Sequence, residues 1–170
     1  TRPGGAWSPQ GQDANSGGIW APVRLHLSRG ATLDETILRP DWSQGLTHPA
    51  LKADIRYRAL GQGTATVRLT ATPANFSGRP YQADFPVTLE SGAHSVQLTL
   101  PMPKAKLWWP VGTGKPHLYT IRVALRDENG LMDTAVTRTG LRKIVEQPDN
   151  KGWLINDKRL FIKGSNYIGS

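Results

Sequence analysis

Apolar and polar residues alternate one by one along two runs in the middle of the chain. The apolar positions are Ala53, Ile55, Tyr57 and Ala59 in the first run and Ala65, Val67 and Leu69 in the second. Polar or charged residues fill the positions between them. A period of two is typical of a strand with one buried face. Gly61-Gln62-Gly63 separates the runs, so we expect them to form a hairpin.

The same alternation predicts further short strands. They are expected near residues 23–27, 36–40, 83–89, 96–100, 118–126 and 131–138. Pro40 and Pro86 lack a backbone N–H, so we expect their strands at sheet edges or strand ends. Asn129-Gly130 favours a hairpin between the last two strands, because both residues tolerate a positive φ. About eight strands without helical periodicity predict an all-β protein, an immunoglobulin-like antiparallel β-sandwich of seven to eight strands.

Two adjacent indoles, Trp108 and Trp109, precede the strand at 118–126. Together they carry too much apolar surface to be left in water. Pro110 and the glycines after it exclude a helix. The sequence therefore predicts a tryptophan-rich loop that is pinned against the protein at the entry to a strand.

Composition limits the partners that the chain can have. Its 170 residues suit one domain, with room for a fragment of another. The formal net charge is +8, but basic runs never exceed two residues, so we expect a solvated surface and no nucleic-acid partner. No apolar stretch approaches the ~20 residues of a membrane span, so we expect no membrane partner. The chain has no cysteine, which excludes disulfides and leaves the redox compartment undetermined.

Residues that could perform catalysis or bind a metal are scattered along the chain. The four histidines, at positions 26, 48, 94 and 117, lack the spacing of metal ligands. Asp34-Glu35 and Asp127-Glu128 are expected in solvated turns. The chain contains no nucleophile elbow, phosphate loop or cysteine nucleophile. We therefore predict no catalytic residue, no metal site and no cofactor in this chain.

Three segments carry longer motifs. Residues 107–119 contain Leu-Trp-Trp-Pro followed by Gly-x-Gly-x-Pro-x-Leu-Tyr, residues 16–25 contain Gly-Gly-Ile-Trp-Ala-Pro-Val, and Gly-Trp-Leu-Ile-Asn at 152–156 continues through 160–167. These motifs resemble glycoside hydrolase family 2, in particular its β-mannosidase and exo-β-glucosaminidase branch. Residues 107–119 are similar to the segment that precedes the last strands of its immunoglobulin-like domain. Residues 16–25 are similar to the junction after its sugar-binding-like domain, and residues 152–167 are similar to the entry into its catalytic barrel.

The resemblance implies a division of the chain into three parts. Residues 1–19 would be the tail of the preceding sugar-binding-like domain or a linker, and residues 20–146 the β-sandwich. Residues 147–170 would be a linker, a hairpin and the first strand of a truncated (β/α)8 barrel. The family's two catalytic glutamates lie on later barrel strands and match no position here. The implied function is a non-catalytic spacer of an exo-acting retaining β-glycosidase, inactive alone, with mannose, glucosamine and galactose all open as the sugar.

The resemblance also implies roles for particular residues. Trp20, Trp108 and Trp109 would contact other domains of the same polypeptide. Asn166 and Tyr167 would contact a β-linked glycan substrate in the parent enzyme, or else form a turn at the end of a strand. The resemblance favours a periplasmic or extracellular location.

Two alternatives remain open at this point. Gly5-Ala6-Trp7-Ser8-Pro9 stands where the branch has Gly-Trp-Asp-Trp-Gly-Pro, and Ala6 cannot hydrogen-bond a sugar hydroxyl. Either the sugar differs or the match fails here, in which case Trp7 anchors a loop. The alternative to a spacer is a free-standing immunoglobulin-like carbohydrate-binding or adhesion module, which should display at least one of Trp108 and Trp109 to solvent.

Overall fold

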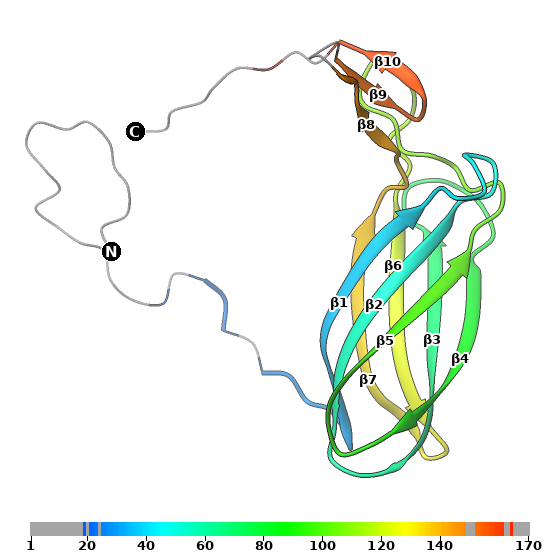
Figure 1. The fold of residues 1–170 in the computed structure, drawn as a ribbon. Coiled ribbons are helices and arrows are strands. Elements are labelled where there is room, and N and C mark those ends of the chain that lie inside the picture. The colour runs from blue at the N-terminus through cyan, green and yellow to red at the C-terminus, as the bar shows by residue number, and fades with distance from the viewer. Residues whose placement is uncertain (1–18, 20, 24, 149–151, 162–163, 165–170) are drawn as a thin grey trace, which may run out of the picture. The chain divides into compact units, whose positions relative to one another are not determined.

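Alternating side chains place strands throughout the unit formed by Leu27–Phe161 (Figure 1). The computed structural model describes residues 19, 21–23, 25–148, 152–161 and 164. No α-helix occurs among these residues, and every strand pairing is antiparallel. The prediction of an all-β protein is therefore confirmed.

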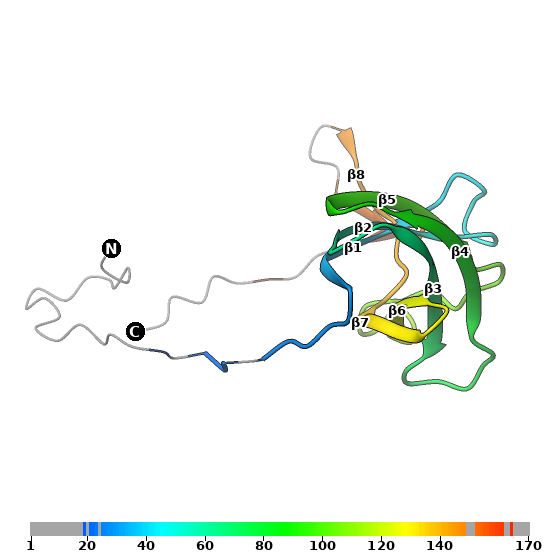
Figure 2. The ribbon, with the colours of Figure 1, turned by 90° about the horizontal axis from the view of Figure 1, so that it is seen from below.

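Seven strands form two sheets that face each other (Figure 2). The first sheet has the order β1 (Ala31–Asp41), β2 (Ala50–Ala59) and β5 (Gly92–Pro101). The second has the order β4 (Tyr81–Leu89), β3 (Gly63–Pro73), β6 (Tyr119–Asp127) and β7 (Gly130–Thr139). This arrangement confirms the immunoglobulin-like sandwich. Pro40 in β1 and Pro86 in β4 both lie on edge strands, as predicted.

The core lies between the inner faces of these sheets. Every apolar residue of the two runs that alternate at 53–59 and 65–69 is at most 6% exposed. Strand β6 adds Tyr119, Ile121, Val123 and Leu125, each at most 1% exposed. The period-two pattern thus correctly predicts which face of each strand is buried.

The predicted hairpin between residues 53–59 and 65–69 is wrong. Strand β2 pairs with β1 and β5, whereas β3 pairs with β4 and β6. The short link between β2 and β3 crosses from one sheet to the other, so the two strands face each other across the core. Alternation specifies the buried face of a strand but not the neighbour that shares its hydrogen bonds.

The strand expected near residues 23–27 is also absent. Val23, Leu25 and Leu27 are 79%, 85% and 80% exposed, and the first strand of the described chain begins at Ala31. Strand β1 pairs with β2 only, and no described segment pairs with its other edge. Alternation produces a strand only where a neighbouring backbone supplies hydrogen bonds.

A buried carboxylate connects the two sheets at their margin. Asp133 in β7 is 4% exposed. Its Oδ2 accepts a hydrogen bond from Leu33 N of β1 at 2.6 Å, and its Oδ1 accepts one from Thr134 N at 2.7 Å. The pairing registers shift beside both contacts, between Leu33 and Glu35 and between Leu125 and Arg126. Asp133 therefore supplies the acceptors that the ladders lack at these bulges.

The hairpin between β6 and β7 confirms the turn predicted at Asn129-Gly130, but with a different backbone. Of the two residues Asn129 and Gly130, only Gly130 has a positive φ, of 115°. The N–H of Asn129 instead donates to Asp127 Oδ1 at 2.9 Å. The glycine therefore occupies the left-handed position that follows the turn, where a side chain would be strained.

A third, small sheet follows the sandwich. It has the order β10 (Lys158–Leu160), β9 (Trp153–Ile155) and β8 (Ile144–Glu146), and it contains the hairpin predicted at this position. Asn156 and Asp157 form the turn with φ values of 51° and 64°, the pair of positive angles that a tight two-residue hairpin requires. Sequence reasoning placed residues 144–146 before a linker and did not anticipate their pairing with β9.

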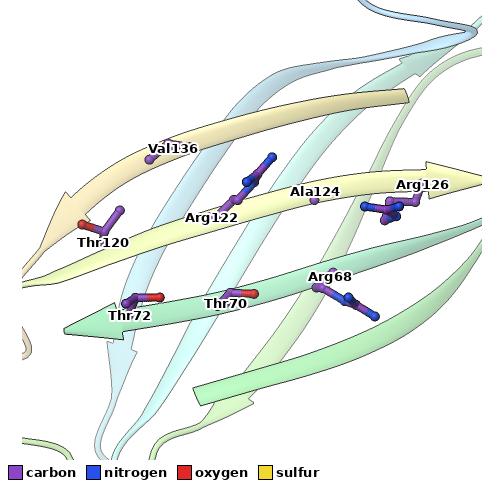
Figure 3. Close-up of a pocket in the computed structure, with 8 residues that line it drawn as sticks. All are labelled: Arg68, Thr70, Thr72, Thr120, Arg122, Ala124, Arg126 and Val136. Atoms are coloured by element: carbon purple, nitrogen blue, oxygen red, sulfur yellow. The ribbon is translucent and has the colours of Figure 1, made fainter. Parts of the chain in front are cut away.

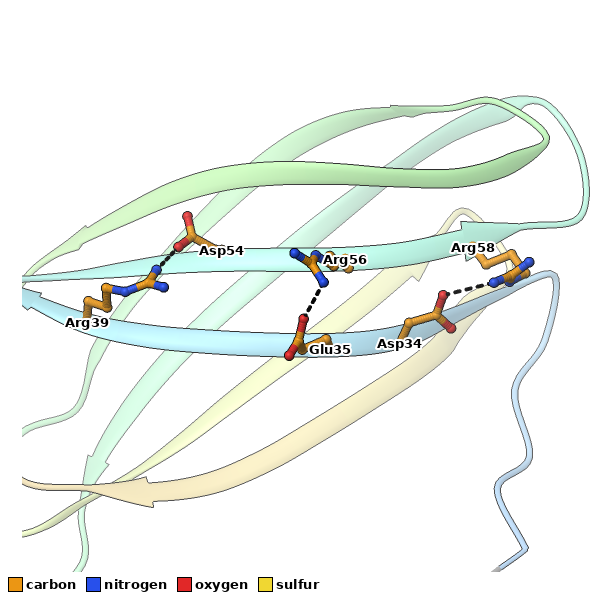
Figure 4. Close-up of polar contacts among 6 residues, drawn as sticks. All are labelled: Asp34, Glu35, Arg39, Asp54, Arg56 and Arg58. Carbon is orange, nitrogen blue, oxygen red and sulfur yellow. Dashed lines mark hydrogen bonds and ion pairs between the residues drawn. The ribbon is translucent and has the colours of Figure 1, made fainter.

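Acidic and basic side chains alternate on the outer face of the first sheet (Figure 4). Arg56 pairs with Glu35 at 2.8 Å, Arg58 pairs with Asp34 at 3.6 Å, and Arg39 pairs with Asp54. Lys52 pairs with Asp41 at 3.1 Å on the same sheet. Asp34 and Glu35 therefore lie in a strand, which corrects the expectation that they occupy a turn. The cross-strand register places each acid near a base.

Candidate domain-contact site

Residues 107–118, named the Trp loop here, form the later part of the connection between β5 and β6, and backbone hydrogen bonds fix the loop to the segment after β7 and to itself. Trp108 N donates to Leu141 O at 2.8 Å, and Trp109 N donates to Lys115 O at 3.2 Å. Asn75 joins the far end of the loop, since its Nδ2 donates to Pro116 O and its Oδ1 accepts from Leu118 N. The loop is therefore fixed by contacts within this chain, as the sequence predicts.

Two glycines provide the surfaces against which the indoles lie. A Cβ atom on Gly140 would lie 2.8 Å from Trp108, and a Cβ atom on Gly114 would lie 2.7 Å from Trp109. Such separations are shorter than real Cβ contacts, so only glycine permits these approaches. The Arg142 guanidinium lies 4.8 Å from the Trp108 ring centroid, within the range of a cation–π contact. Both indoles are half-buried.

Asn156 ties the small sheet to the Trp loop and is 5% exposed. Its Nδ2 donates to Trp108 O at 3.0 Å, and its Oδ1 accepts from Lys143 N at 2.9 Å. The backbone N–H of Asn156 donates to Lys143 O at 2.8 Å. Lys143 Nζ also pairs with Asp157 Oδ1 at 2.7 Å. One buried amide thus joins the β9–β10 turn, the segment before β8 and the Trp loop.

An aromatic cluster supports the base of the Trp loop. The Tyr119 ring meets Phe76 edge to face at a centroid distance of 5.1 Å, and Tyr81 lies 6.3 Å away. Lys106 N donates to the Tyr119 hydroxyl at 2.8 Å. This bond from a tyrosine at the start of a strand back to the upstream backbone is similar to the tyrosine corner of immunoglobulin-like domains. Burial raises the pKa of Tyr119 to about 12.

Replacing Tyr119 with phenylalanine should change how stability depends on pH. Because the folded protein raises the Tyr119 pKa above the ordinary value of ~10, its contribution is complete below pH ~10 and is lost as pH rises toward about 12. At neutral pH, Tyr119→Phe leaves Lys106 N–H without its acceptor and should cost about 1 kcal/mol. Urea unfolding across alkaline pH should show the gap between wild type and variant shrinking, and a constant gap would contradict this assignment.

The apex of the Trp loop is apolar and open to solvent. Val111 is 95% exposed, and it lies between Pro110 and Gly112, whose φ is 84°. Sequence reasoning did not single out Val111. The available signal was an aliphatic residue between a proline and a glycine, two residues that favour a turn.

The structure brings together only some of the predicted site residues. Trp108 and Trp109 lie side by side in the Trp loop, whereas Trp20, Asn166, Tyr167 and the segment 5–9 lie outside the described residues. Of the first barrel strand, expected from Leu160 onward, the structure describes Leu160 at the end of β10, Phe161, which is 82% exposed, and Gly164.

The described residues contain no group of three or more His, Asp or Glu side chains that could hold a metal ion. Nor does that part of the chain contain a helix long and apolar enough to cross a membrane. Asp127, one of the acids considered above, pairs with Arg29 at 2.6 Å, and this hydrogen bond lowers the pKa of Asp127.

Comparisons with known proteins agree on one family. The model of glycosyl hydrolases family 2 matches residues 31–142. The chain is 34% identical to β-mannosidase B of Aspergillus oryzae over 175 residues and 26% identical to an exo-β-D-glucosaminidase of Hypocrea virens over 169 residues. Each match covers 95% of this chain but 19% of the relative, so the chain spans about a fifth of the length of these proteins.

Solved structures show the same fold. A β-D-mannosidase from Dictyoglomus thermophilum superposes with a TM-score of 0.69 and 26% identity, over 82% of this chain and 17% of that one. A glycosyl hydrolase family 2 member from Bacteroides cellulosilyticus has a TM-score of 0.69 at 17% identity, over 81% of this chain and 19% of that one, which shows the fold alone.

Proposed function

The chain belongs to glycoside hydrolase family 2, and from this premise we propose that it is a non-catalytic β-sandwich spacer of an exo-acting retaining β-glycosidase. In this role it holds a sugar-binding-like domain against the catalytic barrel. The small sheet and the segment after it lead toward the barrel. Trp20, Trp108 and Trp109 contribute to domain contacts, and Asn166 and Tyr167 contact the glycan substrate in the parent enzyme only.

The observation that carries this proposal is the construction of the Trp loop. Both indoles lie against glycine backbone, Trp108 lies beneath Arg142, and Asn156 fixes the loop to the small sheet. A module that captures sugars on a tryptophan would need one indole face open to solvent. Both rings are half-buried within the chain and Arg142 covers one face of Trp108, which supports a rigid junction with Val111 as the exposed apex.

Retaining hydrolysis needs two carboxyl groups ~5–5.5 Å apart, one as nucleophile and one as acid and base. Carboxylates on the sandwich are engaged otherwise: Glu35 and Asp54 pair with arginines on a strand face, and Asp133 accepts backbone N–H groups. We therefore assign catalysis to a different part of the parent enzyme. Its substrate would be a β-linked glycan, of the kind that the names of the relatives describe.

Two measurements test the spacer role. The coding sequence beyond residue 170 should continue into a barrel that carries two suitably placed glutamates. Hydrogen exchange at Val111 and Gly112 should then be at least about tenfold slower in the longer polypeptide than in this chain, because a domain contact covers the apex. The turn residue Asn129 serves as the control and should exchange equally in both. Equal exchange at the apex, or a coding sequence without a barrel, would contradict the proposal.

A further inference from the structure

The outer faces of the two sheets differ in charge balance. On the first sheet, four basic and four acidic side chains form cross-strand pairs. On the second sheet, Arg68 pairs with Asp84 through two contacts of 2.6 Å, but Arg122 and Arg126 form no ion pair with any carboxylate of the described chain. Of the acids close to Arg126, Asp84 pairs with Arg68 and Asp127 pairs with Arg29, although the charge of Arg126 also helps to lower the pKa of Asp84. Arg122 Nε donates to Thr134 Oγ1 at 3.2 Å, which is a neutral partner.

Arg122 and Arg126 border a shallow hollow of about 640 Å³ on the second sheet (Figure 3). Its lining residues are Arg68, Thr70, Thr72, Thr120, Arg122, Ala124, Arg126 and Val136. Strands β3 and β6 supply most of these side chains, which stand on one face and leave the floor to the small Ala124. The hollow is therefore a trough that guanidinium and hydroxyl groups border, while the carbon atoms of these side chains make up most of its exposed lining.

We propose that this Arg–Thr face binds a carboxylate-bearing polysaccharide. Arginine presents paired N–H groups that match a carboxylate, and threonine hydroxyls both donate to and accept from sugar hydroxyls. Arg122 and Arg126 lie four residues apart on one face of β6, so their Cα atoms are about 13 Å apart along the strand. A polymer with repeated acidic groups satisfies both arginines, which a single small anion cannot.

The lining residues disfavour the other polyanions. None of them is aromatic, so the face has no platform on which nucleic-acid bases could stack. Val136, 61% exposed, is the one large aliphatic side chain that lines the hollow, whereas protein interfaces depend on buried apolar anchors. A hydroxyl-rich chain with carboxylates fits these groups better than either alternative. This inference is independent of the spacer role, because none of the residues that line the hollow belongs to the Trp loop.

Binding of polygalacturonate by the 170-residue chain, measured by calorimetry at low ionic strength, tests the proposal. Arg122→Gln/Arg126→Gln should weaken binding at least about tenfold, because two charge-assisted contacts are lost. The matched control is Arg56→Gln/Arg58→Gln, which removes the same charge from the other sheet and should change affinity less than about twofold. Fully methyl-esterified polygalacturonate keeps the sugar backbone without the charge and should bind at least about tenfold more weakly. Circular dichroism checks that each variant remains folded.

Four results would overturn the proposal. The first is no detectable binding of polygalacturonate by the wild-type chain, and the second is equal weakening by both double variants, which would indicate attraction by net charge alone. The third is tighter binding of poly-L-glutamate through the same arginines, which would assign the face to an acidic protein surface. The fourth is tighter binding of double-stranded DNA through them. A Trp109→Ala variant should bind polygalacturonate as wild type does, so this test is separate from that of the spacer role.

Discussion

Replacing Asp133 with alanine should lower the free energy of unfolding by about 3 kcal/mol, because two backbone N–H groups lose their acceptor in a largely buried site. The side chain joins β1 to β7, so its loss loosens the contact between the two sheets at their shared margin. Urea unfolding followed by tryptophan fluorescence measures the change as a lower midpoint.

Two companion variants separate this role from a general effect of charge. Asp133→Asn keeps one carbonyl acceptor and should cost about half as much as alanine. Asp54→Ala removes a carboxylate whose side chain is 30% exposed and paired with Arg39 on the outer face, so it should cost less than about 1 kcal/mol. If Asp133→Ala unfolded at the wild-type midpoint, the proposed connection between the sheets would be wrong.

Gly140→Ala should cost about 2–3 kcal/mol, because the new Cβ atom would lie 2.8 Å from three atoms of Trp108. The ring has little room to move, since the backbone of Trp108 is fixed to Leu141 and its carbonyl accepts from Asn156. We expect Trp108 to be displaced toward solvent, with a red shift of tryptophan emission together with the loss of stability.

Gly61→Ala provides the matched control for this substitution. A Cβ atom at Gly61 would meet nothing within 4 Å, and the residue does not have a positive φ. This variant should therefore change stability by less than about 0.5 kcal/mol. Similar losses at both positions would mean that backbone entropy, and not the approach of Trp108, determines the need for glycine at 140.

The burial of strand faces could be predicted from sequence because it depends on each strand alone. Leu69 and Ile55 follow from period two and the preference of apolar groups for the core. The pairing partners could not be predicted, since β2 and β3 carry the same pattern whether they share a sheet or face each other. At residues 23–27 the alternation predicts a strand, but no described neighbouring strand pairs with this segment, and Val23, Leu25 and Leu27 are exposed.

The candidate site divides in the same way. Trp108 and Trp109 could be identified because their size alone requires a packing surface. Asn156 could not, because its function depends on bonds to Lys143 and Trp108, which are distant in the sequence. The glycine surfaces at 114 and 140 also become visible only when the loop is folded against them.

The amide of Asn156 also contributes to how the chain responds to mechanical load. Tension applied beyond β10 is carried by this side chain, by the contacts of Lys143 with Asn156 and Asp157, and by the short β9–β10 and β8–β9 ladders, which have three residue pairs each. The long ladders of the sandwich share such a load over many more bonds. Under force, the β9–β10 hairpin should therefore detach at a lower load than the sandwich strands, so the two sheets stay folded while the hairpin opens.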